Sequence, residues 1–120
     1  MRKDLELAEM FKALAAPARI TMIQLLKNGA LCVGALANRL GVTPGAVSQH
    51  LRILRAAGLV EAEKRGYFVH YRINRQTLAR WRTAMEAFLD PGGTEETYQL
   101  IEEGEAICAR KSRPARNRKS

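Results

Sequence analysis

The fold of this chain is decided by residues 42–60, which read VTPGAVSQHLRILRAAGLV. Thr43 is a good N-cap and Pro44 suits the first turn of a helix, so the sequence predicts a helix from residue 44 to about residue 57. Gly58 is the expected stop signal at the end of that helix. Its apolar stripe has helical spacing and is expected to be buried: Val47, Leu51 and Leu54.

The other side of the helix at 44–57 carries small or polar side chains. Gly45 and Ala46 permit the start of the helix to approach base edges closely, and Arg52 lies on the same side. Gln49 can pair bidentately with adenine, and Ser48 can bond a base or a phosphate. The amides at the helix start can also bind a phosphate. The pattern therefore predicts a helix that enters the major groove of DNA.

Three helices are expected before residue 42, because apolar residues recur there at helical spacing. The first covers about residues 3–15, the second runs from Pro17 to Asn28, and the short third one ends at Gly41. Their expected apolar positions are Leu7, Phe11 and Leu14, then Ile20, Ile23, Leu25 and Leu26, then Val33, Leu36, Ala37 and Leu40. The short third helix, the tight turn and the helix at 44–57 make a helix-turn-helix.

A β-hairpin and a long helix are expected after Gly58. Residues 67–73 alternate with period two, and residues 59–64 can form the partner strand. The expected turn is Arg65-Gly66, and the basic tip Lys64-Arg65-Gly66 can reach phosphates or the adjacent minor groove. The order of elements predicts a mainly α fold with a small β-hairpin, a dimeric winged helix-turn-helix.

The expectation of a dimer rests on two apolar stripes near opposite ends of the domain. One is the stripe at 3–15, and the other lies on the long helix after the hairpin: Leu78, Trp81, Met85 and Phe88. One small domain has difficulty covering both, so we expect a homodimer with these residues, Trp81 included, in its interface.

The alternative to a DNA-binding helix-turn-helix is a plain small helical bundle, in which residues 43–55 form an ordinary amphipathic helix with a solvated face. It explains neither the small residues at the helix start nor the basic hairpin.

Charge divides the chain into three parts. Residues 1–90, the expected winged helix-turn-helix and dimerisation domain, hold 14 Lys and Arg against 7 Asp and Glu. Residues 91–109 hold 5 acidic residues and no basic one, which predicts an acidic helix, whereas residues 110–120 hold 6 basic residues and are expected to be disordered. A basic domain favours polyanions, although charge alone does not separate DNA, RNA and an anionic membrane.

Three segments resemble the ArsR/SmtB family of bacterial repressors: residues 30–37 (ALCVGALA), residues 47–60 (VSQHLRILRAAGLV) and residues 64–73 (KRGYFVHYRI). The resemblance covers about residues 5–90. It implies a homodimer, built on the first and fifth helices, that releases DNA on sensing a ligand, often a metal ion. By position, five residues match the DNA-contacting start of the family's recognition helix: Thr43, Pro44, Gly45, Ser48 and Gln49. The complete set of candidate DNA-binding residues adds Ala46, Arg52, Lys64 and Arg65.

The metal sites of the family are incomplete in this sequence. Arsenic- and cadmium-responsive members carry Cys-Val-Cys in the third helix, where this chain reads Cys32-Val33-Gly34 and keeps one thiolate. Zinc-responsive members use Asp and His pairs on the fifth helix, but residues 74–89 contain no histidine and Glu86 is their only acid. Cys32 and Cys108 are therefore either small buried side chains or a joint site for As(III), another thiophilic ion or an oxidant.

Neither histidine is expected to bind a metal ion. His50 follows Gln49 on the helix at 44–57, and we expect it to hydrogen-bond the backbone or DNA. His70 alternates outward on the second strand of the hairpin, where we expect it to be solvated or near phosphate.

These features predict a sequence-specific transcriptional repressor that binds an inverted-repeat operator in double-stranded DNA as a homodimer and is released by an effector. The alternative is a winged-helix protein-interaction module with no effector site, and duplex binding with a strong salt dependence separates the two. An enzyme is not expected, because no Ser/His/Asp set, carboxylate pair or phosphate-binding glycine loop is evident. Without an apolar run of about 20 residues or an apolar signal segment, we expect a cytoplasmic protein with no membrane contact.

Overall fold

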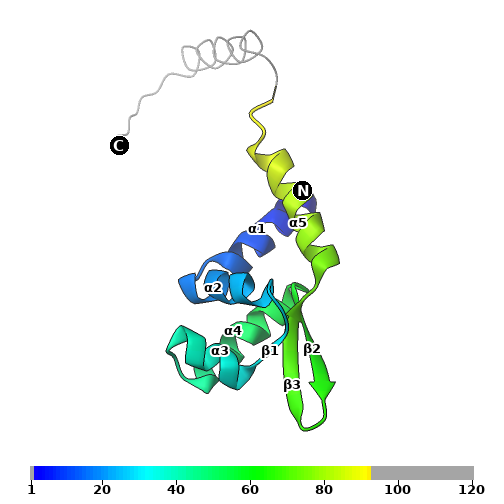
Figure 1. The fold of residues 1–120 in the computed structure, drawn as a ribbon. Coiled ribbons are helices and arrows are strands. Elements are labelled where there is room, and N and C mark those ends of the chain that lie inside the picture. The colour runs from blue at the N-terminus through cyan, green and yellow to red at the C-terminus, as the bar shows by residue number, and fades with distance from the viewer. Residues whose placement is uncertain (1, 93–120) are drawn as a thin grey trace, which may run out of the picture. The chain divides into compact units, whose positions relative to one another are not determined.

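The computed structural model describes residues 2–92, and its mainly helical architecture with a small sheet confirms the predicted fold of the protomer (Figure 1). The elements in chain order are α1 (Arg2–Leu14), α2 (Pro17–Leu26), β1 (Leu31–Cys32), α3 (Val33–Leu40), α4 (Pro44–Ala56), β2 (Val60–Arg65), β3 (Phe68–Ile73) and α5 (Arg75–Leu89). Beyond Gly92, the predicted acidic helix and basic tail lie outside the described residues. Within 2–92, no helix is both long enough and apolar enough to cross a membrane.

The helix-turn-helix forms where its local signals predict it. Gly41 ends α3 in the left-handed conformation, with φ 69°, which a residue with a side chain rarely adopts. Thr43 is extended, and its Oγ1 accepts a hydrogen bond from the amide of Ala46 at 3.1 Å. Pro44 then opens α4, because a proline needs no amide partner in the first turn.

The sheet has three antiparallel strands in the order β1-β3-β2, one strand more than the predicted hairpin. The two-residue strand β1 was not expected, and it places Cys32 opposite His70. In the hairpin, Arg65 pairs with Phe68, so the turn consists of Gly66 and Tyr67 and the predicted turn at 65–66 is one residue early. Gly66 has φ 64°, as a tight two-residue turn requires.

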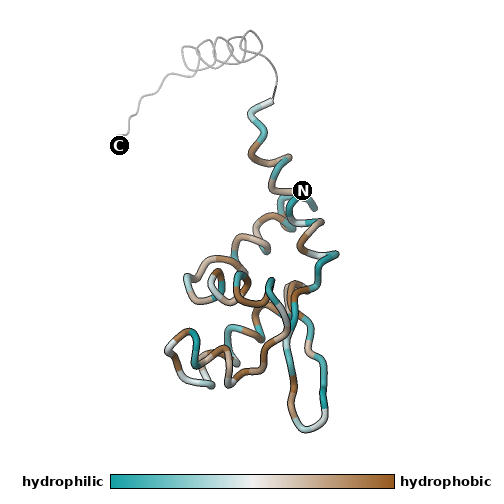
Figure 2. The backbone as a smooth tube through the Cα atoms, viewed as in Figure 1, coloured by the Kyte–Doolittle hydropathy of each residue, from teal (hydrophilic) through white to brown (hydrophobic). Residues whose placement is uncertain are grey.

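The core lies where α2, α3 and α4 meet the base of the hairpin. Its largest fully buried side chains are Met22, Leu26, Leu36, Leu51, Leu54, Leu59 and Val47. Figure 2 shows hydrophobic and hydrophilic stretches alternating along the helices, as one-sided burial requires. Ile20, which was expected in the core, is exposed because α2 turns its later residues Met22, Ile23 and Leu26 inward.

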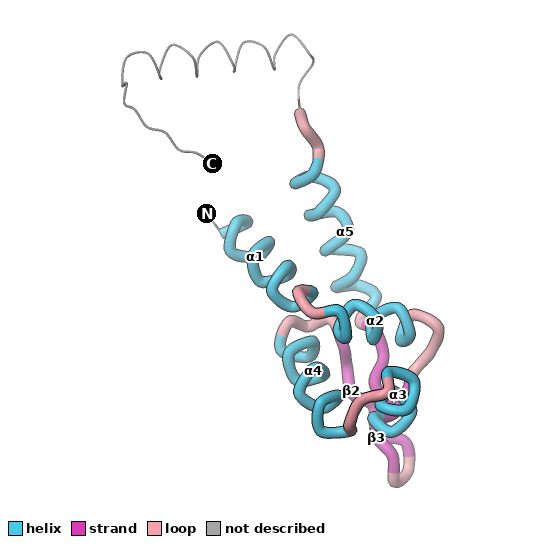
Figure 3. Tube along the Cα trace, turned by 90° about the vertical axis from the view of Figure 1, so that its left-hand side faces the viewer, coloured by secondary structure: helices cyan, strands magenta, loops and turns pink. Residues whose placement is uncertain are grey.

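The helices α1 and α5 extend together away from the turn of the hairpin (Figures 1 and 3). Their buried apolar residues are Met10 and Ala13 on α1 and Trp81 on α5. The prediction that placed Trp81 in a dimer interface needs correction, because this side chain is 6% exposed in the core of a single chain. Phe11 and Phe88 remain 40% and 56% exposed, with ring centroids 5.7 Å apart.

Candidate nucleic-acid interface

The outer face of α4 is polar and open to solvent. Ser48, Gln49 and Arg52 are exposed, while the residues on the inner face of the same helix are buried: Val47, Leu51 and Leu54. Because one side of α4 is fixed in the core, the exposed side chains project from a rigid element. Three of the predicted base-contacting or phosphate-contacting residues are thus brought to one surface.

The start of α4 is free of bulky side chains. A Cβ atom added at Gly45 would meet only the Oγ1 of Thr43, at 4.0 Å, and Gly45 does not have a positive φ. The fold therefore does not need a glycine there, either for space or for conformation. The missing side chain instead leaves room for an external group to approach the helix N-terminus, where the dipole favours a phosphate.

A hollow of about 410 Å³ lies between α4 and β3. Its polar lining comes from Ser48, Arg52 and Arg55 on α4 and from Tyr71 on β3. Sequence reasoning missed Arg55, although its position three residues after Arg52 and seven after Ser48 places it on the same side of a helix. Two guanidinium groups beside an open hollow make a surface suited to the phosphates of a polyanion.

The wing, defined as β2, β3 and their turn, does not present its basic residues as the sequence predicts. Lys64 and Arg65 are consecutive in β2 and therefore point to opposite faces of the sheet. The Nη2 of Arg65 lies 3.4 Å from Oε1 of Glu63. The same Glu63 oxygen is 3.8 Å from Nη1 of Arg72, whose Nη2 is 3.1 Å from Glu61. Carboxylates on the wing therefore compete with any phosphate for two of its arginines.

Two exposed aromatic residues stand at the wing turn and were not among the predicted site residues. Tyr67 is 100% exposed and Phe68 is 64% exposed. What sets them apart from other exposed residues is their position at a protruding turn. The alternation in the sequence predicts only that Phe68 points out of the sheet.

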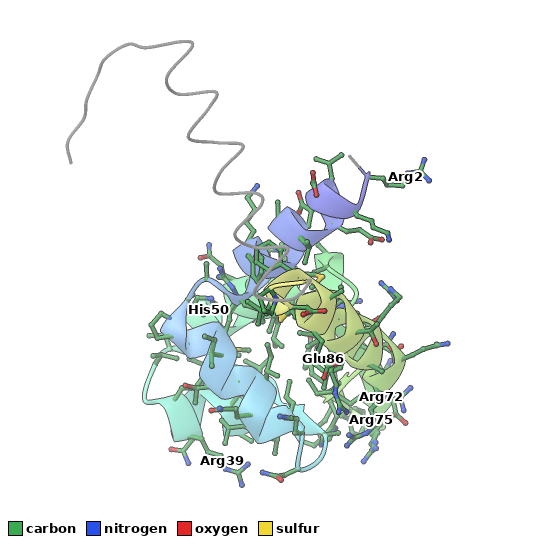
Figure 4. All side chains as sticks on the ribbon, turned by 90° about the horizontal axis from the view of Figure 1, so that it is seen from above. Arg2, Arg39, His50, Arg72, Arg75 and Glu86 are labelled. Atoms are coloured by element: carbon green, nitrogen blue, oxygen red, sulfur yellow. The ribbon has the colours of Figure 1, made fainter. Side chains whose placement is uncertain are left out.

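His50 points away from the solvent-exposed face of α4, toward the place where α1 ends and α2 begins (Figure 4). Its Nδ1 lies 3.1 Å from Nη1 of Arg19, in the first turn of α2. Nδ1 therefore bonds a side chain 31 residues away in the sequence and not the backbone, while the expected contact of His50 with DNA stays a prediction.

Cys32 is a free, half-buried thiol at the N-cap of α3. A Cβ atom added at Gly34 would lie 4.0 Å from the Sγ of Cys32, so a cysteine at position 34 would stand beside that thiol. This chain has none there, and residues 2–92 hold no group of three His, Cys, Asp or Glu side chains that could bind a metal ion. The second predicted ligand, Cys108, lies outside the described residues.

His70 is half-buried, which corrects the expectation that this residue is solvated. Its Nδ1 is buried and makes no hydrogen bond to the described part of the chain. The unexpected strand β1 explains the difference, because Cys32 pairs with His70 on one side and Glu63 pairs with it on the other.

Comparison with known proteins finds the same architecture in transcriptional regulators. Residues 16–62 match the family model described as "Bacterial regulatory protein, arsR family". The repressor SmtB of Mycobacterium tuberculosis is 45% identical over 71 residues, which are 59% of this chain and 53% of that relative, so the match spans about half of the relative's length. The biofilm growth-associated repressor of Agrobacterium fabrum is 33% identical over 72% of this chain and 74% of its own length. A crystal structure described as a "Possible transcriptional regulator for arsenical resistance" is 35% identical over 79% of this chain and 95% of that chain, with a TM-score of 0.63.

Proposed function

Since this chain belongs to the ArsR family of bacterial regulatory proteins, which are transcriptional regulators and not enzymes, we propose that it is a repressor that binds an inverted-repeat operator as a homodimer. Each protomer inserts the N-terminal half of α4 into a major groove. The residues proposed to contact DNA there are Thr43, Pro44, Gly45, Ala46, Ser48, Gln49 and Arg52. The wing contributes Lys64 and Arg65.

The observation that carries this proposal is the division of α4 into a buried face and an open polar face. A recognition helix must be held rigidly while its side chains remain free to reach base edges. Gln49 is exposed on the open face, and an amide side chain can donate to and accept from adenine at once. The unobstructed Gly45 supports close approach of the helix start.

The arginine-lined hollow beside α4 supports contacts to the DNA backbone. Arg52 and Arg55 line it from the helix, and we assign them to phosphates on the edge of the major groove. Each phosphate neutralised releases condensed counterions, so binding should weaken steeply as salt rises. The wing then reaches the adjacent groove with Tyr67 at its tip.

The homodimer is proposed to form through α1 and α5. Leu5, Phe11 and Phe88 on these helices are 63%, 40% and 56% exposed, and together they leave apolar surface that one chain does not cover. A two-fold dimer presents two copies of α4, which matches half-sites about one helical turn apart.

The effector is proposed to act through Cys32. Cys32 occupies the N-cap position of α3, the first helix of the helix-turn-helix, although its side chain makes no capping hydrogen bond. A group bound to its thiol would therefore act at the start of α3 and shift this helix against α4. The described residues alone do not complete a chelate. A site for As(III) or another thiophilic ion, or a disulfide formed by an oxidant, would need Cys108 of either subunit.

The experiment that tests the function selects duplexes from a random pool with the full chain and then measures the affinity of the selected duplex against salt. We expect an inverted repeat, a steep salt dependence and a dimer in sedimentation. Binding with no sequence preference, or no duplex binding, would favour a protein-interaction module instead. Titration of the complex with arsenite, Cd(II), Zn(II) and an oxidant, repeated with Cys32→Ser, tests the effector: release that is unchanged in the variant removes Cys32 from the proposal.

A further inference from the structure

Arg19 hydrogen-bonds two separate helices at once. Its Nε donates to the carbonyl of Ala13 at 2.6 Å and its Nη2 donates to the carbonyl of Lys12 at 3.2 Å, both in the last turn of α1. Its Nη1 lies 3.1 Å from Nδ1 of His50 in α4. Because a guanidinium has donors only, Nδ1 of His50 is the acceptor in this bond.

Arg19 forms a bridge between α1 and α4, and at its first end the guanidinium binds carbonyl groups at the C-terminus of α1. The last carbonyls of a helix have no partner within the helix and carry partial negative charge, which a guanidinium offsets. Among residues 2–92, every side-chain hydrogen bond between α1 and another element comes from Arg19. Loss of Arg19 would therefore leave α1 joined to the rest of the chain by backbone continuity and apolar packing.

The second end of the bridge meets α4 beside its proposed base-reading residue. His50 is half-buried and lies between the exposed Gln49 and the buried Leu51. A hydrogen bond at this level of the helix restrains both the rotation and the tilt of α4. The packing of Leu51 holds α4 in the core, and the hydrogen bond adds a directional restraint to that packing.

We infer that Arg19 is a positioning residue that fixes the recognition helix α4 relative to α1. This inference rests on the proposed function, in which α1 belongs to the dimer interface and α4 enters the major groove. In that dimer, a fixed α1-to-α4 angle sets the separation of the two recognition helices. Arg19 and His50 thereby select operators whose half-sites have the matching spacing, about one helical turn of DNA.

Two simpler roles make different predictions for the same pair. If Arg19 only stabilises the fold, its loss weakens binding to every duplex by the same factor. If His50 contacts a base, its loss weakens binding to an isolated half-site by the same factor as it weakens the contribution of each half-site in the full operator. Only a positioning role makes the effect depend on the distance between half-sites.

The test measures the affinity of the full chain for the selected operator, for the same operator with one or two base pairs inserted between half-sites, and for a single half-site. Arg19→Gln and His50→Ala each remove the bond from one end. His50→Asn keeps an acceptor, because its amide oxygen takes the place of Nδ1. Arg82→Gln is the matched control for loss of one charge, since Arg82 lies on α5 and pairs with Glu86 at 3.2 Å.

We expect Arg19→Gln and His50→Ala to lower affinity for the native spacing by about tenfold, the scale of one hydrogen bond to a charged group. The penalty for inserted base pairs should shrink in both variants, and half-site affinity should stay within about twofold of the wild type. His50→Asn should retain much of the spacing preference, and Arg82→Gln should retain all of it.

An equal loss on every duplex, or no loss on any, would overturn the inference. Sedimentation and thermal unfolding identify a variant that no longer folds or dimerises. In that case the variant at the other end of the bond tests the inference. A wild-type protein that binds duplex DNA without a spacing preference refutes the positioning role alone. A wild-type protein that binds no duplex refutes the proposed function.

Discussion

The apolar face of α4 and the apolar faces of α1 and α5 differ in how completely the chain itself covers them. On α4, Leu51 and Leu54 are 2% and 0% exposed. On α1 and α5, Phe11 and Phe88 are 40% and 56% exposed even though their rings lie close together. All of these residues have the same helical spacing in the sequence. Periodicity therefore identifies an apolar face, but it does not say whether the same chain or a second copy buries it.

The largest effect should come from the covered face. Leu54→Ala leaves a cavity in the core and should lower the free energy of unfolding by about 2–5 kcal/mol. The neighbouring Ile53, which is 42% exposed, is the control, and Ile53→Ala should cost far less. Urea unfolding at one fixed protein concentration measures both. Similar losses for the two variants would mean that α4 is not anchored as the structure shows.

The open face of α4 should affect binding and leave stability unchanged. Gln49→Ala should lower operator affinity by about 1–3 kcal/mol per half-site and relax the preference at one base position. Lys64→Ala, on the wing, should weaken specific and random duplexes alike and reduce the salt slope by about one unit. Fluorescence anisotropy on operators substituted at each position measures the loss of affinity and the change in base preference. The same loss on random DNA for Gln49→Ala would exclude it from base reading.

The uncovered face should affect association more than unfolding of the protomer. Phe88→Ala should weaken the dimer by about 1 kcal/mol per protomer, because about half of this side chain remains to be buried by a partner. Tyr67→Ala removes an exposed aromatic residue from the wing and serves as the control, with no expected change in dimerisation. Sedimentation over a range of concentrations gives the dissociation constant. An unchanged constant for Phe88→Ala would remove α5 from the interface.

The smallest effect should come from the ion pairs of the wing. Glu63→Gln removes the competing carboxylate from Arg65 and the more distant of two from Arg72, which keeps Glu61 at 3.1 Å. DNA affinity should therefore rise by less than about 1 kcal/mol, the range of exposed ion pairs. The salt slope should also become steeper. Glu86→Gln changes the net charge equally but breaks a pair on α5, and it should leave affinity near the wild-type value. If both variants bind more tightly to the same extent, total charge rather than the wing explains the gain.

The elements set by neighbouring residues are predictable from the sequence. The turn before α4 depends on Gly41, Thr43 and Pro44, each of which acts within four residues of its position, and the structure has all three where expected. The buried stripe of α4 follows from its helical spacing. The exposed Ser48, Gln49 and Arg52 follow from the same spacing, so most of the candidate DNA surface could be predicted as well.

The features that sequence reasoning missed join distant residues. Strand β1 has two residues, too few to show a period, and it exists only because it pairs with Tyr71 and His70. Arg19 meets His50 across 31 residues, and nothing near either residue indicates the contact. Trp81 was assigned to the dimer because its stripe is apolar, but the core of one chain takes it up. In each case the contact depends on a residue far away in the sequence, which local patterns do not identify.

The order β1-β3-β2 leaves β2 at the edge of the sheet, with a consequence for solubility. An edge strand offers unpaired amides and carbonyls to any other chain, which makes it a starting point for aggregation. Four of the six residues of β2 are charged, and a second strand docked alongside would have to bring its own side chains against them. Replacing Glu61 and Glu63 together to strengthen DNA binding would remove two of these four charges from a protruding hairpin. Removal of acidic residues from β2 can therefore raise the affinity of the wing for DNA only to the point where the edge strand begins to pair with other copies of the chain.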